Sequence, residues 1–239
     1  MGRRRRSLVF GVWVFVLLIT LFSAVLNVPV VGGSGTIYIK ADGSIDPPTA
    51  PIQRNGDVYN FTDNIYDSIV VERDNIVIDG EGYTVQGTGI SNSTGILLSE
   101  RSNVTINNMQ VENFFYGIKL IKSSNNVIFG NNITANNVDG IFLLSSSYNS
   151  ISGNNIANKH YAGIVLLSSS NNGVSENVFI NDGLNVVKSS YNNSVENNTV
   201  NGKPLVYLED VANYVVGDAG QVILVGCRNI RVENLNLSK

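Results

Sequence analysis

Hydrophobic residues occur along this chain in short runs, and each run in the middle of the chain begins directly after a glycine. The runs start at Gly95, Gly117, Gly140 and Gly163, so successive repeat glycines lie 22, 23 and 23 residues apart. Serine and asparagine occupy most positions between the runs. A fixed period of this length indicates that one structural unit is stacked on itself along the chain.

The runs are too short to be helices. No window places apolar residues at the spacing of a helix face, and Ser, Asn and Gly turn signals separate one run from the next. A leucine-rich repeat has a similar period, but its leucine scaffold and helical segment are not seen here. Three short strands joined by turns fit both the period and the composition. The sequence therefore predicts an all-β fold, a parallel β-helix whose coils pair as parallel sheets about 4.8 Å apart.

A series of asparagines keeps the same phase as the apolar runs. Asn126, Asn149 and Asn172 recur 23 residues apart, and Asn193 continues the series. Residues separated by one period lie above one another in stacked coils, so their side-chain amides can form a hydrogen-bonded ladder. Asparagine also tolerates the left-handed backbone conformation of a tight corner. We therefore predict an asparagine ladder along one corner of the solenoid.

Residues 1–31 differ from the rest of the chain. Four arginines, Arg3 to Arg6, precede the uncharged apolar residues 8–26, a stretch that is adequate for a membrane-spanning helix and long for a signal peptide. The arginines place the N-terminus in the cytoplasm and the rest of the chain outside. Residues 1–31 are predicted to be either a signal peptide or a signal-anchor transmembrane segment. Both deliver the domain to the periplasm, the cell surface or the extracellular space.

The exported part divides into a cap and a series of coils. Residues 32–64 are predicted to be a linker and N-terminal cap, with a strand at 36–39 and a proline-rich loop that cannot pair on a central strand. Residues 65–239 are predicted to form the β-helix repeats, with an insertion or long turn over 202–220. The repeat stops in mid-coil, which suggests truncation. Further coils or another protein are expected to cover that end, because open β edges invite aggregation.

Charge and cysteine content exclude some classes of function. The net charge is −3, and without the four N-terminal arginines it is −7, which argues against a nucleic-acid groove. A single cysteine, Cys227, excludes an intramolecular disulfide framework and is typical of a small core residue.

Several segments resemble a known family. Residues 36–45 (TIYIKADGSI), 79–83 (DGEGY) and 201–205 (NGKPL), together with the Ser-Ser-x-Asn repeats, resemble the NosD-like proteins of archaea and bacteria. The resemblance covers residues 36–239. It implies a right-handed parallel β-helix of the pectin-lyase-like superfamily, also described as the carbohydrate-binding and sugar-hydrolysis (CASH) domain, here with about six to seven coils of 20–23 residues. For NosD itself the implied role is periplasmic support of copper-site maturation in nitrous oxide reductase.

The sequence does not favour a copper site or another cofactor. Copper requires soft or imidazole ligands, and the available side chains, Met1, Met109, His160 and Cys227, are scattered along the chain. His160 lies at a predicted turn, where a surface histidine is the simpler interpretation. We therefore expect no bound metal and no cofactor.

A lyase or hydrolase of polysaccharides needs carboxylates gathered on one face. Asp139 and Asp182 each precede a glycine-led strand and are expected two coils apart, with Ala162 between them. Glu176 is expected to align with Glu196 on another face. Asp139, Asp182 and Glu176 are therefore the candidate catalytic residues, although Asp-Gly is also common turn chemistry and the glutamates suit a solvated corner.

Exposed aromatic residues offer a second kind of glycan contact. Tyr148 and Tyr191 are expected at equivalent positions on the asparagine corner, with Asn171 between them, and Tyr161 lies at a nearby turn. Tyr148, Tyr161 and Tyr191 are the candidate carbohydrate-binding residues. The alternative is that they are ordinary exposed tyrosines at β corners.

Three functions remain open at this point. The favoured one is an exported or membrane-anchored β-helix protein without catalytic activity, which binds a polysaccharide or surface glycan or serves as an interaction scaffold. The second is a polysaccharide lyase or hydrolase that uses the carboxylates. The third is a NosD-type accessory factor for metalloenzyme assembly. This fold supports all three, so the fold alone does not choose among them.

Overall fold

The computed structural model describes residues 35–157 and 161–235. The predicted signal or anchor over residues 1–31, with its apolar stretch 8–26, lies outside the described residues. Among the residues that are described, no helix is long and apolar enough to cross a membrane. The described residues belong to one compact unit.

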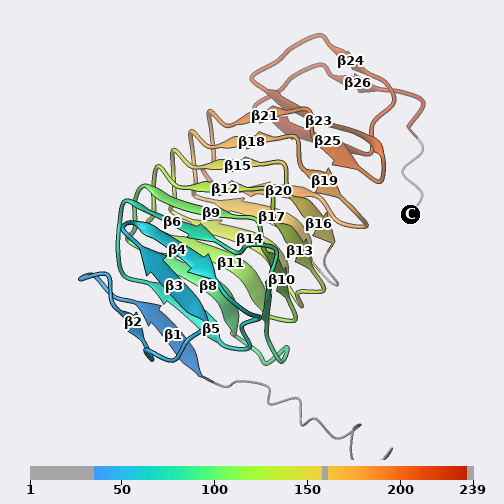
Figure 1. The fold of residues 1–239 in the computed structure, drawn as a ribbon. Coiled ribbons are helices and arrows are strands. Elements are labelled where there is room, and N and C mark those ends of the chain that lie inside the picture. Colours follow the sequence, from blue (N-terminus) through green and yellow to red (C-terminus); the bar gives the residue numbers. More distant parts are fainter. Residues whose placement is uncertain (1–34, 158–160, 236–239) are drawn as a thin grey trace, which may run out of the picture. The chain divides into compact units, whose positions relative to one another are not determined.

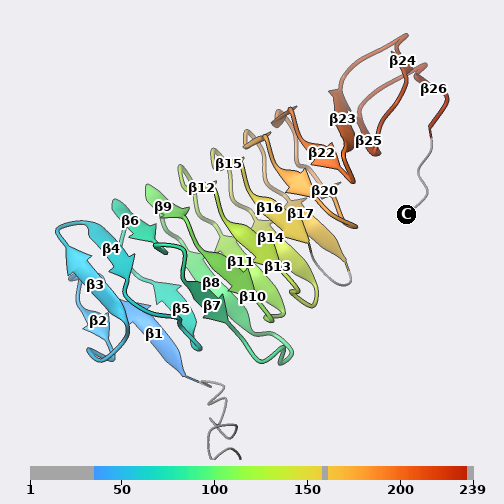
Figure 2. The same cartoon turned by 45° about the vertical axis from the view of Figure 1, so that its right-hand side comes forward.

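The described residues form a parallel β-helix and contain no helix, as predicted (Figures 1 and 2). Six successive coils each contribute one strand to each of three sheets, here called A, B and C. In spatial order, sheet A consists of β2 (Ile45–Asp46), β1 (Thr36–Ile39), β5 (Ser68–Val71), β8 (Thr94–Ser99), β11 (Tyr116–Ile121), β14 (Asp139–Leu144), β17 (Ala162–Leu167) and β20 (Leu184–Val187).

Sheets B and C follow the same stacking order. Sheet B consists of β3 (Ile52–Asn55), β4 (Val58–Phe61), β6 (Ile76–Asp79), β9 (Val104–Asn107), β12 (Val127–Phe129), β15 (Ser150–Ser152), β18 (Gly173–Ser175) and β21 (Ser194–Glu196). Sheet C consists of β7 (Thr84–Gln86), β10 (Gln110–Glu112), β13 (Asn132–Thr134), β16 (Asn155–Ala157), β19 (Val178–Phe179), β22 (Thr199–Val200), β23 (Lys203–Glu209) and β25 (Gln221–Val225). Two short strands, β24 (Val215–Val216) and β26 (Arg231–Val232), pair separately.

The core is a column of aliphatic side chains inside the coils. One strand supplies its alternate residues to this column, and the residues at the same position in the next coil lie directly above them. Ile118, Ile141 and Ile164 pair in register across sheet A and are fully buried. Because each coil contributes the same apolar positions, the glycine-led runs of the sequence become continuous stacks, and burying them stabilises the fold.

Three ladders of polar side chains run through the corners of the middle coils. In the first, Asn126 Nδ2 donates to Asn149 Oδ1 at 3.0 Å, and Asn149 and Asn172 repeat the bond to the next rung, ending at Asn193. In the second, Asn131, Asn154, Asn177 and Asn198 are linked in the same way. In the third, backbone N–H groups of Ser123, Ser146 and Ser169 donate to the serine hydroxyl one coil further on. These side chains are buried, so the ladders satisfy polar groups that water does not reach.

The left-handed corner position is not the ladder asparagine but the residue before it. Asn125, Tyr148, Asn171 and Asn192 have φ between 56° and 61°, whereas Asn126, Asn149, Asn172 and Asn193 do not have positive φ. The prediction that the ladder asparagines adopt this conformation was therefore wrong by one residue. A side chain at the left-handed position points to solvent, while the next one enters the coil and can join the ladder.

The segment 202–220, predicted to be an insertion or long turn, contains a strand. A tight turn at Gly202 reverses the chain, so that β23 pairs antiparallel with β22. β23 then pairs in parallel with β25, which lies one further turn along the chain. The phase of the repeat slips at Asn201 because the chain reverses there, and a differently built coil follows.

Candidate functional site

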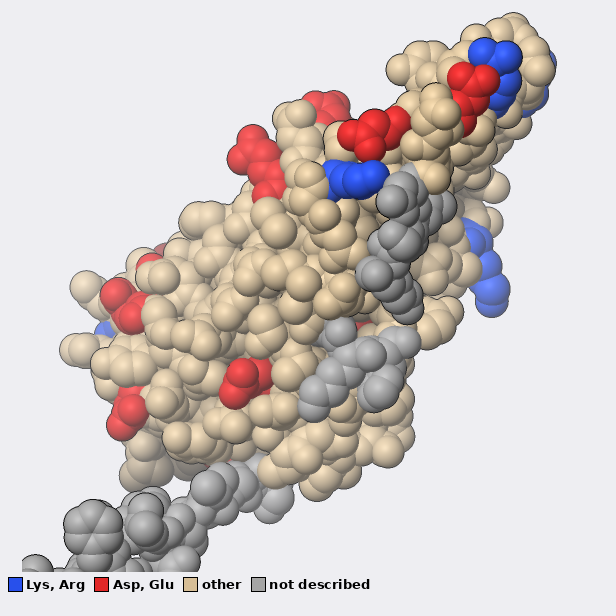
Figure 3. All heavy atoms as spheres, turned by 90° about the vertical axis from the view of Figure 1, so that its right-hand side faces the viewer, with Lys and Arg blue, Asp and Glu red and all other residues tan. Residues whose placement is uncertain are grey.

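The outer faces of the three sheets differ in chemistry. On sheets B and C the outward residues are mostly Ser, Thr, Asn and Gln, and the large apolar exceptions in the β-helix coils and the β3–β4 hairpin are Val58, Val77, Val127, Phe129 and Val178. On sheet A two outward rows are largely apolar. The first row is Tyr38, Val70, Leu97, Lys119, Phe142, Val165 and Asn185, of which Val165 is only 3% exposed, and the second is Ser99, Ile121, Leu144, Leu167 and Val187. Charged groups are sparse on the face drawn in Figure 3, and most of its surface is uncharged.

Strands β11 and β14 place an aromatic, cationic and acidic group together on the outer face of sheet A. We call Phe115, Tyr116, Lys119, Asp139 and Phe142 the sheet A cluster. The rings of Tyr116 and Phe142 lie 5.2 Å apart, and Phe115 packs edge-on against Tyr116 at 4.9 Å. Lys119 Nζ lies 4.3 Å above the Tyr116 ring and 5.6 Å from that of Phe142. A lysine ammonium over two rings is held by cation–π attraction.

The register explains why these five residues meet. Tyr116 pairs with Asp139, and Lys119 pairs with Phe142, because the repeat glycines Gly117 and Gly140 stand at the same position in successive coils. The residues one position before each repeat glycine therefore form one row across the coils, and the residues two positions after it form another. The cluster is a consequence of the period.

Asp139 is the buried acid of this cluster. The residue is 2% exposed, and its Oδ1 atom makes no hydrogen bond within the described part of the chain. Burial raises the pKa of Asp139 to about 6, while a backbone hydrogen bond from Ala162 and the charge of Lys119 oppose that rise. Burial also lowers the pKa of Lys119 and raises the pKa of Tyr116. A carboxyl group held this way can accept or donate a hydrogen bond near neutral pH.

Replacing Asp139 by asparagine is expected to stabilise the protein at pH 7.5 and to change little at pH 4. The folded state raises the pKa of Asp139 above its ordinary value, so its ionisation lowers stability as pH rises from about 4 through about 6, and the loss is complete above that range. Two pKa units correspond to at most about 3 kcal/mol, which solvent screening reduces to about 1–2 kcal/mol. Denaturant unfolding of Asp139→Asn and wild type at both pH values measures this difference.

Glu176→Gln is the matched control for this experiment. Glu176 is an exposed carboxyl at a corner of the solenoid, so its substitution is expected to change the free energy of unfolding by less than about 0.5 kcal/mol. A stability gain of Asp139→Asn that is equal at pH 4 and pH 7.5 would contradict the ionisation account.

The structure separates the three predicted catalytic residues. Asp139 pairs with Ala162, and Asp182 follows in the next coil, half-buried beside Gly163. Glu176 lies on the corner between sheets B and C, with φ of 58°. The expected alignment of Glu176 with Glu196 was wrong, because Glu196 pairs with Ser175 and Glu176 therefore stands level with Asn197. Glu176 is not part of the sheet A cluster.

The three predicted carbohydrate-binding tyrosines are exposed, but they do not form one surface row. Tyr148, Tyr161 and Tyr191 are 62%, 68% and 53% exposed. The ladder bond from Asn172 to Asn193 sets Asn171 level with Asn192, so the expected equivalence of Tyr148 and Tyr191 was wrong by one residue. Tyr191 N instead donates to Ser170 Oγ. Tyr161 lies just before β17, at the edge of sheet A.

The sequence pattern singles out Asp139, and Tyr116 and Phe142 as aromatic residues of the repeats, but it does not connect them or Lys119 with Asp139. The signal was present, since these residues stand at fixed offsets from Gly117 and Gly140. Exposed corner tyrosines were ranked above them because a corner is open to solvent in any β-helix. The apolar character of one outer face becomes visible only when all rows of all three sheets are compared.

The described residues do not assemble a copper-binding set. Met109 is 2% exposed in the core, and Cys227 lies far along the chain, where its Sγ donates to the backbone oxygen of Leu208. No group of three His, Cys, Asp or Glu side chains in the described ranges has the geometry to hold a metal ion. His160 and Met1 lie outside those ranges.

Comparison with known proteins gives one family and one set of folds. A family model described as periplasmic copper-binding protein (NosD) matches residues 36–218. No curated protein shows significant similarity to the chain. A crystal structure of a double mutant of the periplasmic alginate epimerase AlgG is similar, with 18% identity, a TM-score of 0.47, and coverage of 74% of this chain and 49% of that one. The periplasmic alginate epimerase AlgG without those changes matches with 16% identity, a TM-score of 0.39 and the same coverage. The chain spans about half the length of these structures.

Proposed function

This chain belongs to the NosD family, and from that premise we propose that it is a periplasmic β-helix protein that binds polysaccharide on the outer face of sheet A. The sheet A cluster supplies the contacts. Tyr116 and Phe142 offer ring surface to the apolar C–H faces of sugar units, and Lys119 offers a donor to their hydroxyl groups, while the buried Asp139 carboxyl interacts with the Lys119 charge. The protein acts as a binding or scaffold protein without turnover.

The observation that carries this proposal is the contrast among the three outer faces. A solenoid without a ligand needs only polar outer faces, and the outer faces of sheets B and C are polar at most positions. Sheet A instead presents two largely apolar rows beside a buried acid whose ionisation lowers stability. Apolar surface combined with a few polar groups is typical of ligand sites, and a destabilising buried group favours a functional role over a structural one.

Copper supplies no step in this proposal. The family model carries the description of a copper-binding protein, but the donor set in the described residues does not fit that metal, as Met109 is enclosed by the core and Cys227 stands apart. A role in metalloenzyme assembly therefore depends on residues beyond this set.

A lyase or hydrolase on the same face is the second candidate. The observation that favours it is the pKa of Asp139, which burial raises to about 6, because a carboxyl that titrates near neutrality is suited to general acid or base work. Lys119 would then stabilise negative charge on the substrate. Binding and catalysis share the same residues in this case, so the test must measure product release as well as affinity.

A glycan array probed with the full chain, followed by a reducing-end assay on every hit, tests the proposal. The double variant Tyr116→Ala/Phe142→Ala is expected to bind at least about tenfold more weakly, since each partly exposed ring contributes about 1 kcal/mol. Phe129→Ala, which removes an exposed aromatic ring from sheet B, is the matched control and is expected to bind like wild type.

The outcomes separate the candidates. Binding that is lost in the double variant and kept in Phe129→Ala, without new reducing ends, supports the binding function. New reducing ends that disappear in Asp139→Asn favour the enzyme. Glycan binding that is equal in all variants, or absent in wild type, would overturn the assignment of sheet A.

A further inference from the structure

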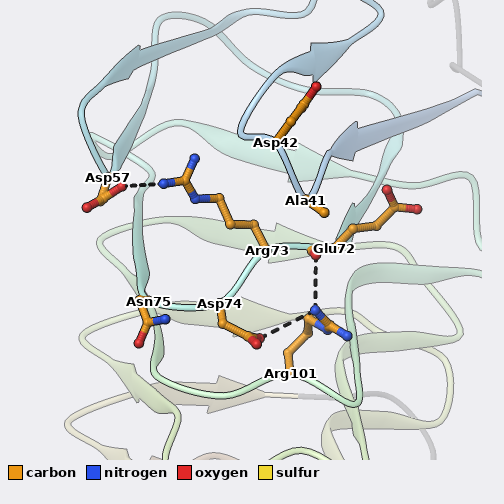
Figure 4. A pocket seen from close by; sticks show the side chains of 8 residues that line it. All are labelled: Ala41, Asp42, Asp57, Glu72, Arg73, Asp74, Asn75 and Arg101. Carbon is orange, nitrogen blue, oxygen red and sulfur yellow. Dashed lines mark hydrogen bonds and ion pairs between the residues drawn. The ribbon is translucent and has the colours of Figure 1, made fainter.

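A charged hollow of about 620 Å³ lies where strands β1, β5 and β8 of sheet A end, near the beginning of the solenoid. Four turns build it (Figure 4). The β1–β2 turn supplies Asp42, the β3–β4 turn supplies Asp57, the β5–β6 corner supplies residues 72–75, and the β8–β9 corner supplies Arg101. None of these residues belongs to the sheet A cluster.

Ion pairs hold two arginines at the wall of the hollow. Arg73 Nη2 donates to Asp57 Oδ1 at 2.6 Å. Arg101 Nη1 donates to the backbone oxygen of Glu72 at 3.0 Å and lies 3.5 Å from Asp74 Oδ1. The Arg73 and Arg101 side chains are 22% and 26% exposed. Both guanidinium planes are thus fixed in place before any ligand arrives, which lowers the entropy cost of binding.

Polar groups remain available in the hollow. Within the described part of the chain, Arg73 Nε and Nη1 and Arg101 Nη2 make no hydrogen bond, and the Glu72 carboxylate has no partner. In Figure 4 the Glu72 side chain extends away from both ion pairs. Asp42 Oδ1 is occupied by the backbone N–H and hydroxyl of Ser44.

The charge balance of the hollow limits the ligand. Arg54 also lies near the hollow. Its guanidinium group and that of Arg73 lie so close to Gly43 that a Cβ atom there would have no room. Four carboxylates, those of Asp42, Asp57, Glu72 and Asp74, then face three guanidinium groups, so the formal charge of the hollow is −1. A phosphate or sulfate would meet too many carboxylates, and the carboxylates in the described residues are not grouped to hold a metal ion.

We infer that this hollow is a second ligand site, and that it takes a neutral saccharide unit. Carboxylate and guanidinium groups are planar and each presents two adjacent acceptors or donors, which match a pair of neighbouring sugar hydroxyl groups. A neutral ligand avoids repulsion from both the carboxylates and the guanidinium groups of the hollow. The inference does not depend on the function proposed for sheet A, since the two sites share no residue.

Amide chemical shifts of the ¹⁵N-labelled full chain, titrated with neutral trisaccharides of glucose, galactose and mannose, test this inference. At least one trisaccharide is expected to shift the amides of Gly43, Arg73 and Asn75. Glu72→Gln is expected to weaken that binding about tenfold, because a hydrogen bond to a charged group is replaced by a neutral one. Glu176→Gln is the matched control and is expected to bind like wild type.

A Tyr116→Ala variant distinguishes this site from sheet A. Shifts at Gly43 and Arg73 that persist in Tyr116→Ala and need about tenfold more ligand in Glu72→Gln support the inference, whatever happens to glycan binding on sheet A. The inference is overturned if none of the trisaccharides shifts these amides, or if Glu72→Gln binds as tightly as wild type.

Discussion

Replacing Asn149 by alanine is expected to lower the free energy of unfolding by about 3–5 kcal/mol. Asn149 Oδ1 accepts from both the backbone N–H and the Nδ2 of Asn126, and Asn149 Nδ2 donates to Asn172 Oδ1 and to the backbone oxygen of Ser123. Alanine removes these bonds at a site that is 2% exposed. The buried groups on the neighbouring coils are then left without partners, and that desolvation cost adds to the lost bonds.

Chemical denaturation followed by circular dichroism measures this change. Ser150→Ala, at the adjacent exposed position of β15, is the control and is expected to stay within about 0.5 kcal/mol of wild type. A loss below about 1 kcal/mol in Asn149→Ala would show that water replaces the missing amide, and the ladder would then not be a major source of stability.

Replacing Gly117 by alanine is expected to cost about 2–4 kcal/mol. A Cβ atom at Gly117 would lie 2.6 Å from the backbone oxygen of Gly140, 2.9 Å from Asn136 Nδ2 and 3.0 Å from Ile133 Cγ2. The first of these contacts is with backbone of the next coil, which cannot move without disturbing the pairing of β11 with β14. The glycine is therefore required for close approach of stacked coils.

Gly173→Ala is the matched control, because a Cβ atom there meets nothing within 4 Å. That substitution is expected to be neutral or to stabilise by up to about 1 kcal/mol, since alanine restricts the unfolded chain more than glycine does. The same denaturation experiment compares the two variants. Equal stability of Gly117→Ala and Gly173→Ala would contradict the steric account of the repeat glycines.

The β-helix was predictable because its evidence repeats. The period that separates Gly117, Gly140 and Gly163 sets the position of each strand of sheet A, so an error in one coil is corrected by the next. The same period accounts for the core column. Segments without the repeat were harder to predict from the sequence. Strand β23 was not predicted because the turn at Gly202 reverses the chain and breaks the phase.

Single positions were harder to place than strands. The ladder step from Asn172 to Asn193 is 21 residues rather than 23, so Tyr191 and Glu196 were assigned one position away from where they lie. A shift of one residue moves a side chain to the other face of a strand. The charged hollow gave no periodic signal at all, because the pairing of Arg73 with Asp57 joins a corner of the first coil to a hairpin turn.

The asparagine ladders also make the solenoid electrically polar along its length. In every rung the side-chain oxygen faces the preceding coil, as Asn149 Oδ1 faces Asn126 and Asn172 Oδ1 faces Asn149. Aligned amide dipoles add, as they do in an α-helix, with the positive end toward higher residue numbers. Glu209 lies at that end, where its carboxylate accepts from the backbone N–H of Asn192 and from the Tyr207 hydroxyl. The ladders thus contribute a field that favours negative charge beyond their last rung.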